Sequence, residues 1–180
     1  MFPLLTTERF FLQQIFPEDQ QFIFEGLSHP DIIRFYGVRY DSLEATKKQM
    51  DWYEKNLKEN TGCSWKIVDK TSGEKIGVVA YYYFKPEHKK AEIGFWIFPQ
   101  YWNKGIVTET LKAVIAYCRK EKGIHRLEAF VEEGNEASSR VLEKLGFVCE
   151  GKMYECEIKD GRFINLIIFG LLSDRQRELE

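Results

Sequence analysis

Residues 100–105, which read QYWNKG, join a strand-like segment at 93–99 to an apolar segment of helical period. The apolar residues of the second segment recur at i, i+4, i+7, i+8 and i+11, and they are Val107, Leu111, Val114, Ile115 and Cys118. That spacing places them on one face of a helix. A glycine-bearing turn that opens a helix leaves backbone N–H groups without partners, and the helix dipole adds partial positive charge there. The turn therefore predicts a binding site for a phosphate or pyrophosphate group.

The segments on both sides of this turn predict a strand–helix–strand unit. We expect a strand at residues 90–98, a helix at 105–122 that Gly123 ends, and a short strand at 126–131. A helical crossover makes the two strands that it joins run parallel in one sheet. One parallel strand pair is therefore expected.

The other segments predict antiparallel strands and flanking helices. Strands at 63–68, 75–84 and 90–98 are separated only by short polar turns, which is the pattern of an antiparallel meander. Further strands are expected at 9–15, 148–159 and 162–172, and further helices from residue 17, from 41 or 42 to 58, and from 135 to 145. We expect a single domain over residues 1–180 of mixed α/β class, with a mostly antiparallel twisted sheet of about seven strands and about four helices.

The charge distribution argues against nucleic-acid and membrane partners. The 180 residues carry a formal net charge of −2, and no stretch concentrates Lys and Arg into the basic face that phosphate neutralisation requires. The N-terminus lacks a basic region followed by a long apolar run, and no segment approaches the ~18 apolar residues of a membrane span. We therefore expect a cytoplasmic protein.

Cysteine and histidine spacing gives no metal-binding pattern. The four cysteines form no CxxC pair, and the three histidines lack the spacing of metal ligands. These residues are Cys63, Cys118, Cys149, Cys156, His29, His88 and His125. The sequence also lacks the GxSxG, GxxxxGKS/T and HExxH motifs of three large enzyme classes. We expect reduced thiols and no metal ion.

Three separated motifs, taken in order, resemble one known family. The motifs are LTTER at 5–9 with PED at 17–19, AEIGFW at 91–96 with the turn at 100–105 and TE at 108–109, and NEAS at 135–138 with LEKLGF at 142–147. One such motif alone is weak support, but the ordered set covers nearly the whole chain. The chain resembles the GNAT-fold N-acetyltransferases, in the branch that includes the RimJ/RimL-type ribosomal-protein N-acetyltransferases.

The resemblance implies that acetyl-CoA is a co-substrate and that the two parallel strands splay to admit its pantetheine arm. The pyrophosphate of coenzyme A suits the amides at 103–107, and the arm would hydrogen-bond to backbone near 95–98. The residues expected to bind coenzyme A are Phe95, Ile97, Phe98, Asn103, Lys104, Gly105, Ile106, Val107 and Asn135. Asn103 stands where the family pattern usually has its first glycine, and asparagine tolerates left-handed backbone better than most residues. Lys104 either adds charge near the phosphates or is a solvated surface lysine.

Two residues at the start of the 135–145 helix carry further expectations. Asn135 is an N-cap by position, and the resemblance adds a contact with the cofactor arm near the thioester. Many GNAT enzymes have a tyrosine acid at the place of Leu142, which cannot donate a proton. The resemblance to the RimL type implies that Ser138 protonates the departing thiolate instead. The alternative for Ser138 is a local hydrogen bond to the backbone.

Glu92 is the candidate general base, acting through water. An α-amine with a pKa near 8 loses its proton at pH 7 for about 1.4 kcal/mol, whereas a lysine amine near 10.4 costs about 4.6 kcal/mol. Period-two alternation places Glu92 on the face of Gly94, Trp96 and Phe98, and burial would have to raise its pKa. The alternative for Glu92 is a salt-bridged sheet residue. Glu109 is expected to serve the helix dipole or a surface ion pair.

The amine acceptor stays open. The resemblance suggests the N-terminal amine of a protein, with a ribosomal protein as one case and a polyamine, an aminoglycoside or another small amine as the alternative. Two groups of residues bear on the acceptor. One group is aromatic and either lines an acceptor site or fills the core, at positions 81–84, 101 and 102. The other group is acidic and either attracts a cationic acceptor or belongs to an exposed hairpin, and it comprises Glu150, Glu155, Glu157 and Asp160. A non-catalytic acyl-CoA-binding module is a further alternative. We expect a monomer or a homodimer.

Overall fold

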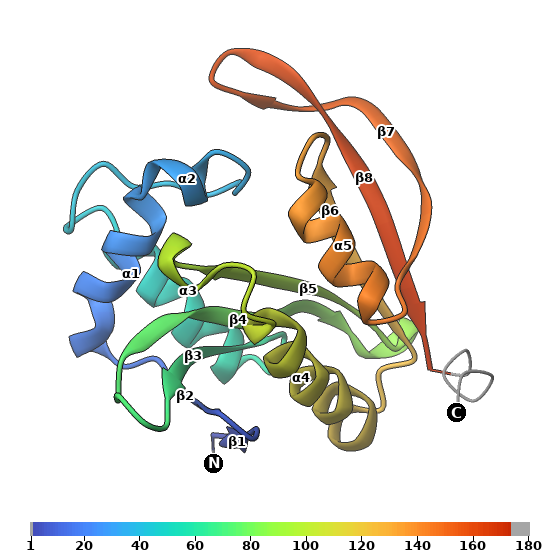
Figure 1. The fold of residues 1–180 in the computed structure, drawn as a ribbon. Coiled ribbons are helices and arrows are strands. Elements are labelled where there is room, and N and C mark those ends of the chain that lie inside the picture. Colours follow the sequence, from blue (N-terminus) through green and yellow to red (C-terminus); the bar gives the residue numbers. More distant parts are fainter. Residues whose placement is uncertain (1, 174–180) are drawn as a thin grey trace.

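The computed structural model describes residues 2–173, which form one twisted eight-stranded sheet with flanking helices (Figure 1). The strands follow the spatial order β1-β2-β3-β4-β5-β6-β8-β7. Their bounds are β1 Leu5–Thr6, β2 Phe10–Gln14, β3 Cys63–Asp69, β4 Lys75–Lys85, β5 Lys90–Ile97, β6 Arg126–Glu132, β7 Val148–Lys159 and β8 Arg162–Leu172. Every neighbouring pair is antiparallel except β5 and β6, which run parallel. The predicted mixed α/β sheet with one parallel pair is confirmed.

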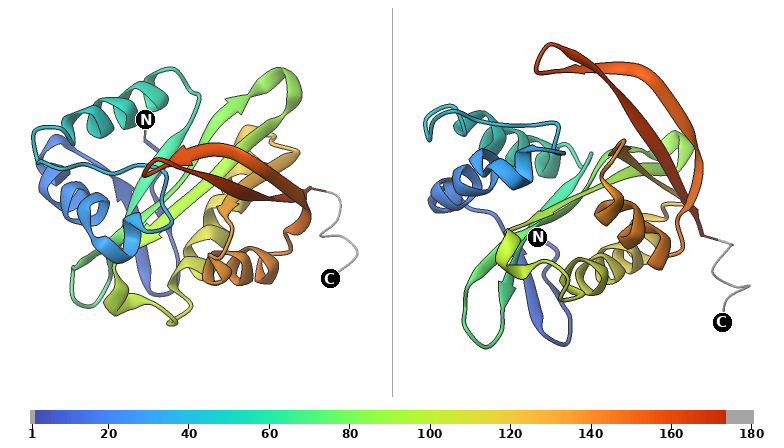
Figure 2. Two further views of the ribbon diagram at one scale, coloured as in Figure 1. Left: turned by 90° about the horizontal axis from the view of Figure 1, so that it is seen from above. Right: turned by 45° about the horizontal axis from the view of Figure 1, so that its top comes forward.

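Five α-helices cover the two faces of the sheet within the described residues. They are α1 Gln20–Ser28, α2 Pro30–Ile33, α3 Lys47–Lys58, α4 Ile106–Lys122 and α5 Glu136–Lys144. Helices α1–α3 lie on one face, and α4 and α5 lie side by side on the other (Figure 1, Figure 2). None of the helices within residues 2–173 combines the length and the apolar character that crossing a lipid bilayer requires.

Two short elements and one helix start differ from the sequence prediction. The strand β1 has two residues and the helix α2 has four, so neither is long enough for a periodic pattern to reveal it. Helix α3 begins at Lys47 and not at 41 or 42. The Ser42 hydroxyl accepts a hydrogen bond from the Ala45 amide (3.1 Å), and the Ser42 carbonyl accepts one from the Thr46 hydroxyl (2.9 Å). These side-chain bonds stabilise a turn where the first helical turn was expected.

The two parallel strands separate part-way along their length. β5 and β6 pair only at Lys90–Arg126, Ala91–Leu127 and Glu92–Glu128. Beyond this last rung β5 continues beside β4 and β6 continues beside β8, so neither has the other as a partner. The family resemblance implied that these two strands splay apart, and the structure agrees.

Side chains of β5 alternate between two hydrophobic cores, one on each face of the sheet. Ala91 and Ile93 are buried in the cluster beneath α4 and α5. Trp96 points to the opposite face, where its ring lies 5.4 Å from that of Phe22 in α1. Side chains at even spacing along a strand share a face, so we expect Glu92 to project to the same side as Trp96. Trp96 and Phe98 belong to the core cluster on this side and Gly94 faces the Tyr82 ring, and the place of the Glu92 side chain beside them stays a prediction from the alternation.

Candidate functional site

The turn before α4 has the backbone of an anion-binding loop. Asn103 (φ 60°) and Gly105 (φ 71°) are both left-handed, and Gly105 is the N-cap of α4. The backbone N–H groups of residues 103–107 donate to no protein acceptor in the described part of the chain. They lie at the positive end of the α4 dipole, where they can donate to phosphate oxygens. Asn103 adopts the left-handed conformation for which the family pattern uses glycine.

The side chains of this segment divide between solvent and core. Ile106 and Val107 are 4% and 8% exposed and anchor the start of α4 in the core. Residues 103–105 are exposed, and the Lys104 ammonium lies 5.5 Å from the ring centroid of Tyr101. The backbone of the turn is thus accessible, with a positive side chain beside it.

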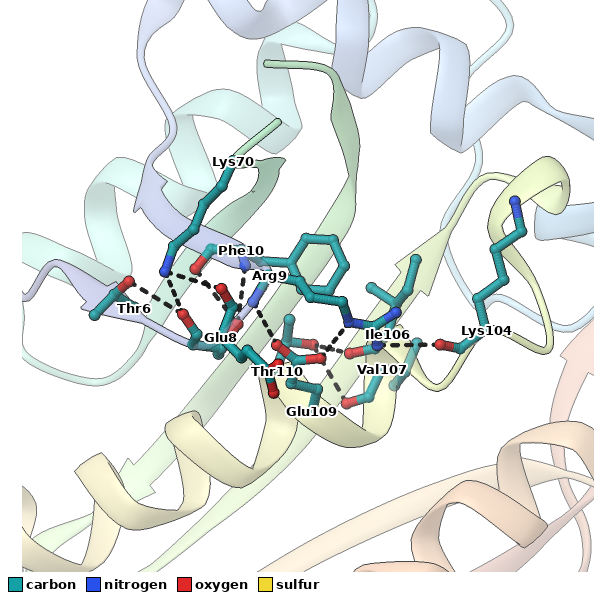
Figure 3. A network of polar contacts seen from close by, with 11 residues as sticks. Thr6, Glu8, Arg9, Phe10, Lys70, Lys104, Ile106, Val107, Glu109 and Thr110 are labelled. Atoms are coloured by element: carbon teal, nitrogen blue, oxygen red, sulfur yellow. Dashed lines mark hydrogen bonds and ion pairs between the residues drawn. The ribbon is translucent and has the colours of Figure 1, made fainter. Parts of the chain in front are cut away.

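Arg9 reaches this turn from the connection between β1 and β2 (Figure 3). Its backbone N–H and its Nε donate to the two carboxylate oxygens of Glu109 at 2.9 and 2.7 Å, and its Nη2 donates to the Lys104 carbonyl oxygen at 3.1 Å. Burial alone would raise the pKa of Glu109, but hydrogen bonds from Thr7 and Arg9 outweigh burial and hold that pKa below its usual value. Glu109 therefore forms a surface ion pair, one of its two expected roles. Sequence reasoning assigned Arg9 no role, and the available signal was its place in the LTTER motif.

Glu92 occupies the last paired rung of β5 and β6, opposite Glu128. Its half-buried carboxylate makes no hydrogen bond or ion pair within residues 2–173, so the salt-bridged alternative is not realised. Burial, and then the charge of Glu128, raise the pKa of Glu92. Glu128 itself pairs with Lys90 at 3.1 Å and with Arg126 at 2.8 Å. Glu92 is therefore a carboxylate that its position makes more basic than usual.

A bulge in β4 turns two tyrosines toward α3 beside Glu92. The β4–β5 register shifts after the Tyr82–Glu92 pair, and Tyr83 has a φ of 52°. The rings of Tyr82 and Tyr83 pack against Trp52 of α3, with centroid distances of 5.7 and 6.3 Å. A Cβ atom at Gly94 would lie 2.6 Å from the Tyr82 ring, so glycine is required for this packing. Bulges often re-aim side chains next to functional sites.

Of the aromatic residues considered for an acceptor site, some lie on the face of Glu92 and others pack in the core or hold the turn before α4. Tyr82 lies on the face of Glu92, whereas Tyr81 is 1% exposed and belongs to the core on the α4 side. Trp102 is partly exposed, and its Nε1 donates to the Ile97 carbonyl oxygen at 3.0 Å. Trp102 thus fastens the turn to the end of β5.

Asn135 caps helix α5 and leaves part of its amide group available. Its Oδ1 accepts a hydrogen bond from the Ser138 amide at 3.2 Å, which confirms the predicted N-cap. The local hydroxyl-to-backbone bond is made by Ser139, whose Oγ donates to the Asn135 carbonyl oxygen at 3.3 Å. The Ser138 hydroxyl makes no hydrogen bond within the described residues. Leu142 is fully buried and packs in the core.

The two helix starts lie at one edge of the sheet. α4 follows β5 and α5 follows β6, and the carboxyl ends of parallel strands meet at the same edge. The turn before α4 and Asn135 are therefore at the same end of the separated strands. Phe95 and Ile97 pack on the α4 side and Phe98 packs on the α1 side. Glu92 lies where the separation begins.

The β7–β8 hairpin extends above α2 (Figure 1), and side chains at its tip contact the segment that follows α2. The Lys159 ammonium donates to the Arg34 carbonyl oxygen at 2.6 Å, and Asp160 pairs with Arg39 at 2.5 Å. These contacts hold the hairpin against the α1–α3 side of the molecule.

The acidic residues of this hairpin differ in their surroundings. Glu150 and Asp160 form ion pairs with arginines. Glu157 is exposed, and its charge adds to burial and Glu128 in raising the pKa of Glu92. Only part of the acidic set is therefore placed to act on a cationic acceptor near Glu92.

Comparisons with known proteins agree on one family. The family model described as Acetyltransferase (GNAT) domain matches residues 9–148. The uncharacterized N-acetyltransferase YoaA of Bacillus subtilis (strain 168) is 30% identical over 177 residues, which is 98% of this chain and 100% of that protein.

Two solved structures share the fold. RimL, the ribosomal L7/L12 alpha-N-protein acetyltransferase solved in complex with coenzyme A, has a TM-score of 0.86 at 19% identity over 96% of this chain and 99% of its own. The spermidine N-acetyltransferase of Vibrio cholerae, in complex with CoA and spermine, has a TM-score of 0.82 at 21% identity over 96% and 99% of the two chains. The chain belongs to the GNAT acetyltransferase family.

Proposed function

We propose that this protein is an acetyl-CoA-dependent N-acetyltransferase that acetylates a primary amine. The observation that carries the proposal is the row of unpartnered amides at residues 103–107, at the N-terminus of α4. Such a row donates to the oxygens of a pyrophosphate, and the helix dipole adds to the attraction. Coenzyme A in complex with similarly folded acetyltransferases supports the same ligand.

The residues present fit coenzyme A along a path from α4 to the separated strands. The amides at 103–107 would hold the pyrophosphate, with Lys104 beside them. Beyond Glu92, the side of β5 that no longer pairs with β6 offers backbone groups to the pantetheine arm. The Asn135 Nδ2, which makes no hydrogen bond within residues 2–173, offers a further donor. Acetyl-CoA supplies the acetyl thioester.

Glu92 and Ser138 would move the two protons of the reaction. Glu92 would accept a proton, through a water molecule, from the amine whose nitrogen bonds to the acetyl carbon in a ternary complex. Its raised pKa makes it a better base than an ordinary glutamate. Ser138 would donate a proton to the sulfur as the carbon–sulfur bond breaks, since its hydroxyl is not used by the described part of the protein.

The N-terminal amine of a protein is the acceptor that we propose. An α-amine needs about 1.4 kcal/mol to lose its proton at pH 7, against about 4.6 kcal/mol for a lysine amine, so a moderately basic carboxylate is sufficient. The β7–β8 hairpin also exposes apolar side chains that a polypeptide can contact, namely Tyr154 (74%), Ile158 (68%) and Phe163 (64%). The exposed Glu157 near Glu92 favours a polyamine as the second candidate.

Thiol release from acetyl-CoA with a panel of amines tests this proposal. The panel contains a peptide with a free N-terminus, the same peptide N-acetylated as its control, spermidine and an aminoglycoside. We expect the free peptide to accelerate thiol release and the acetylated control to have no effect. Faster release with spermidine, suppressed by salt, would support the second candidate. If calorimetry detects coenzyme A binding and no amine accelerates release, the protein is a binding module and the enzymatic proposal is wrong.

A further inference from the structure

Arg9 connects the turn before α4 to the helix itself. Its backbone N–H and Nε hold Glu109 in the first turn of α4, and its Nη2 holds the Lys104 carbonyl in the turn. These partners lie 100 and 95 positions away along the chain. The guanidinium thus bridges two points that flank the start of the helix (Figure 3).

Hydrogen bonds of Trp102 hold the upstream end of the turn. The Trp102 amide donates to the Pro99 carbonyl oxygen, and its indole Nε1 donates to the Ile97 carbonyl oxygen, both at 3.0 Å. Trp102 thus holds the turn from one end, and Arg9 holds it at Lys104. Asn103, between these two contacts, has a left-handed backbone. The left-handed conformation costs an asparagine less than most residues but more than a glycine, so contacts that hold the turn help to maintain it. Contacts at both ends of the turn supply that constraint.

Arg9 is itself held by the connection between β1 and β2. Its carbonyl oxygen accepts a hydrogen bond from the Lys70 amide at 3.0 Å, and the Lys70 ammonium contacts the carbonyl oxygens of Thr7 and Glu8. The Thr7 amide donates to the Phe10 carbonyl oxygen at 2.9 Å. The Arg9 side chain is 46% exposed, so backbone contacts more than burial determine its position.

We propose that Arg9 is a positioning residue for coenzyme A: through Glu109 and the Lys104 carbonyl, it fixes the amides at 103–107 in the orientation that binds the pyrophosphate. This inference rests on the proposed function, because it requires coenzyme A at that turn. A loop that is ordered before binding loses less conformational entropy when the ligand arrives. The planar guanidinium donates in several fixed directions at once, which a lysine ammonium cannot reproduce.

The competing explanation is that Arg9 acts only as a positive charge near the phosphates. The two explanations differ in what Glu109 does. If charge alone matters, removing the Glu109 carboxylate leaves a more positive field and strengthens binding. If positioning matters, removing either partner frees the turn and weakens binding.

Calorimetric titration of coenzyme A separates the two explanations. The proteins compared are wild type, Arg9→Gln, Arg9→Lys, Glu109→Gln and the double variant Arg9→Gln/Glu109→Gln. The matched control is Arg39→Gln, which breaks the surface pair with Asp160 at the hairpin tip. Positioning predicts an affinity loss of about five- to tenfold in Arg9→Gln and Glu109→Gln, discounted for exposure of the pair. It also predicts a double-variant loss close to either single loss, a smaller loss in Arg9→Lys and none in Arg39→Gln.

Steady-state kinetics add a readout that a general loss of stability would not give. KM for acetyl-CoA should rise in Arg9→Gln, while kcat at saturating acetyl-CoA stays within about twofold of wild type. Unchanged affinity in Arg9→Gln, unchanged or stronger binding in Glu109→Gln, or full affinity in Arg9→Lys would overturn the inference. If either single variant fails to fold, judged by its melting curve without ligand, the other tests the same contact. A wild-type protein that binds no coenzyme A would refute the proposed function before any variant is measured.

Discussion

Glu92→Gln tests the proposed chemistry most sharply, because the two side chains have nearly the same shape and differ in charge. Glu92 makes no ion pair within residues 2–173, so the substitution leaves no described partner unpaired. It removes a carboxylate whose pKa is raised by burial and by Glu128. We expect kcat to fall about 10²-fold, the lower end of what a general base contributes, since an α-amine needs only about 1.4 kcal/mol to deprotonate at pH 7. Coenzyme A affinity should change by less than about twofold, because the pyrophosphate is assigned to other residues.

The role of Glu92 as a base also predicts how activity depends on pH in wild type and in the variant. Wild-type activity should fall on the acid side as Glu92 takes up a proton, and its raised pKa places that fall at higher pH than for an ordinary glutamate. The variant should lose this limb, and its rate should rise about tenfold per pH unit up to the pKa of the amine, because only the neutral amine reacts. Thiol release at saturating acetyl-CoA, at pH values below and above the amine pKa, measures both. Glu87→Gln, in the exposed turn before β5, is the matched control and should change neither profile nor rate.

The same substitution should stabilise the fold at neutral pH. A carboxylate whose native pKa is raised contributes most stability when protonated and loses that contribution as pH rises through the native pKa. Glutamine removes the charged form and the cost of burying it. Because the Glu92 carboxylate is only half-buried, solvent screening reduces this cost, and we expect Tm to rise by a few degrees at most. The Tm gain should fade as pH falls and Glu92 becomes protonated. Equal losses of turnover and coenzyme A affinity, or an unaltered pH profile, would refute the role given to Glu92.

Three further substitutions follow from the geometry. Asn103→Gly should preserve the left-handed turn and keep or improve coenzyme A affinity in calorimetry; a large loss would mean that the asparagine side chain itself binds the ligand. Ser138→Ala should lower kcat about 10²-fold with little change in KM for acetyl-CoA, and an unchanged kcat would remove Ser138 from the mechanism. Asp19→Asn should lower the free energy of unfolding by about 3 kcal/mol, because the buried Asp19 carboxylate contacts Lys66 and Lys75, both at 2.6 Å. Burial raises the pKa of Asp19, but the two lysines outweigh burial and lower it, so this stabilisation is present at neutral pH and is lost as pH falls through the native pKa. Denaturant unfolding at neutral and acid pH checks it, and a stability difference that does not shrink in acid would contradict it.

Apolar periodicity was sufficient to predict the long elements of the fold. Helix α4 and the strands β3–β5 each bury one or two faces over enough residues for a period to be visible. The parallel pairing of β5 and β6 followed from the helical crossover between them. The point at which that pairing stops has no signal in the composition of either strand, and only the family resemblance implied it.

Contacts between distant segments could not be read from local patterns. A glutamate near a helix start is compatible with the dipole or with an ion pair, and the partner of Glu109 lies 100 residues away. The bulge at Tyr83 depends on a left-handed tyrosine, which no neighbouring residue type announces. The roles of Glu92, Ser138 and the cofactor residues stay predictions, as do the single-domain extent, the cytoplasmic location and the monomeric or homodimeric state.

We propose above all that the backbone amides of residues 103–107 bind the pyrophosphate of coenzyme A. A crystal structure of the coenzyme A complex measures this most directly, through the distances from those nitrogens to the pyrophosphate oxygens. We predict several distances in the hydrogen-bonding range of about 2.7–3.2 Å, with the left-handed turn unchanged. Coenzyme A bound at another place, or a pyrophosphate held by side chains while these amides face solvent, would contradict the claim.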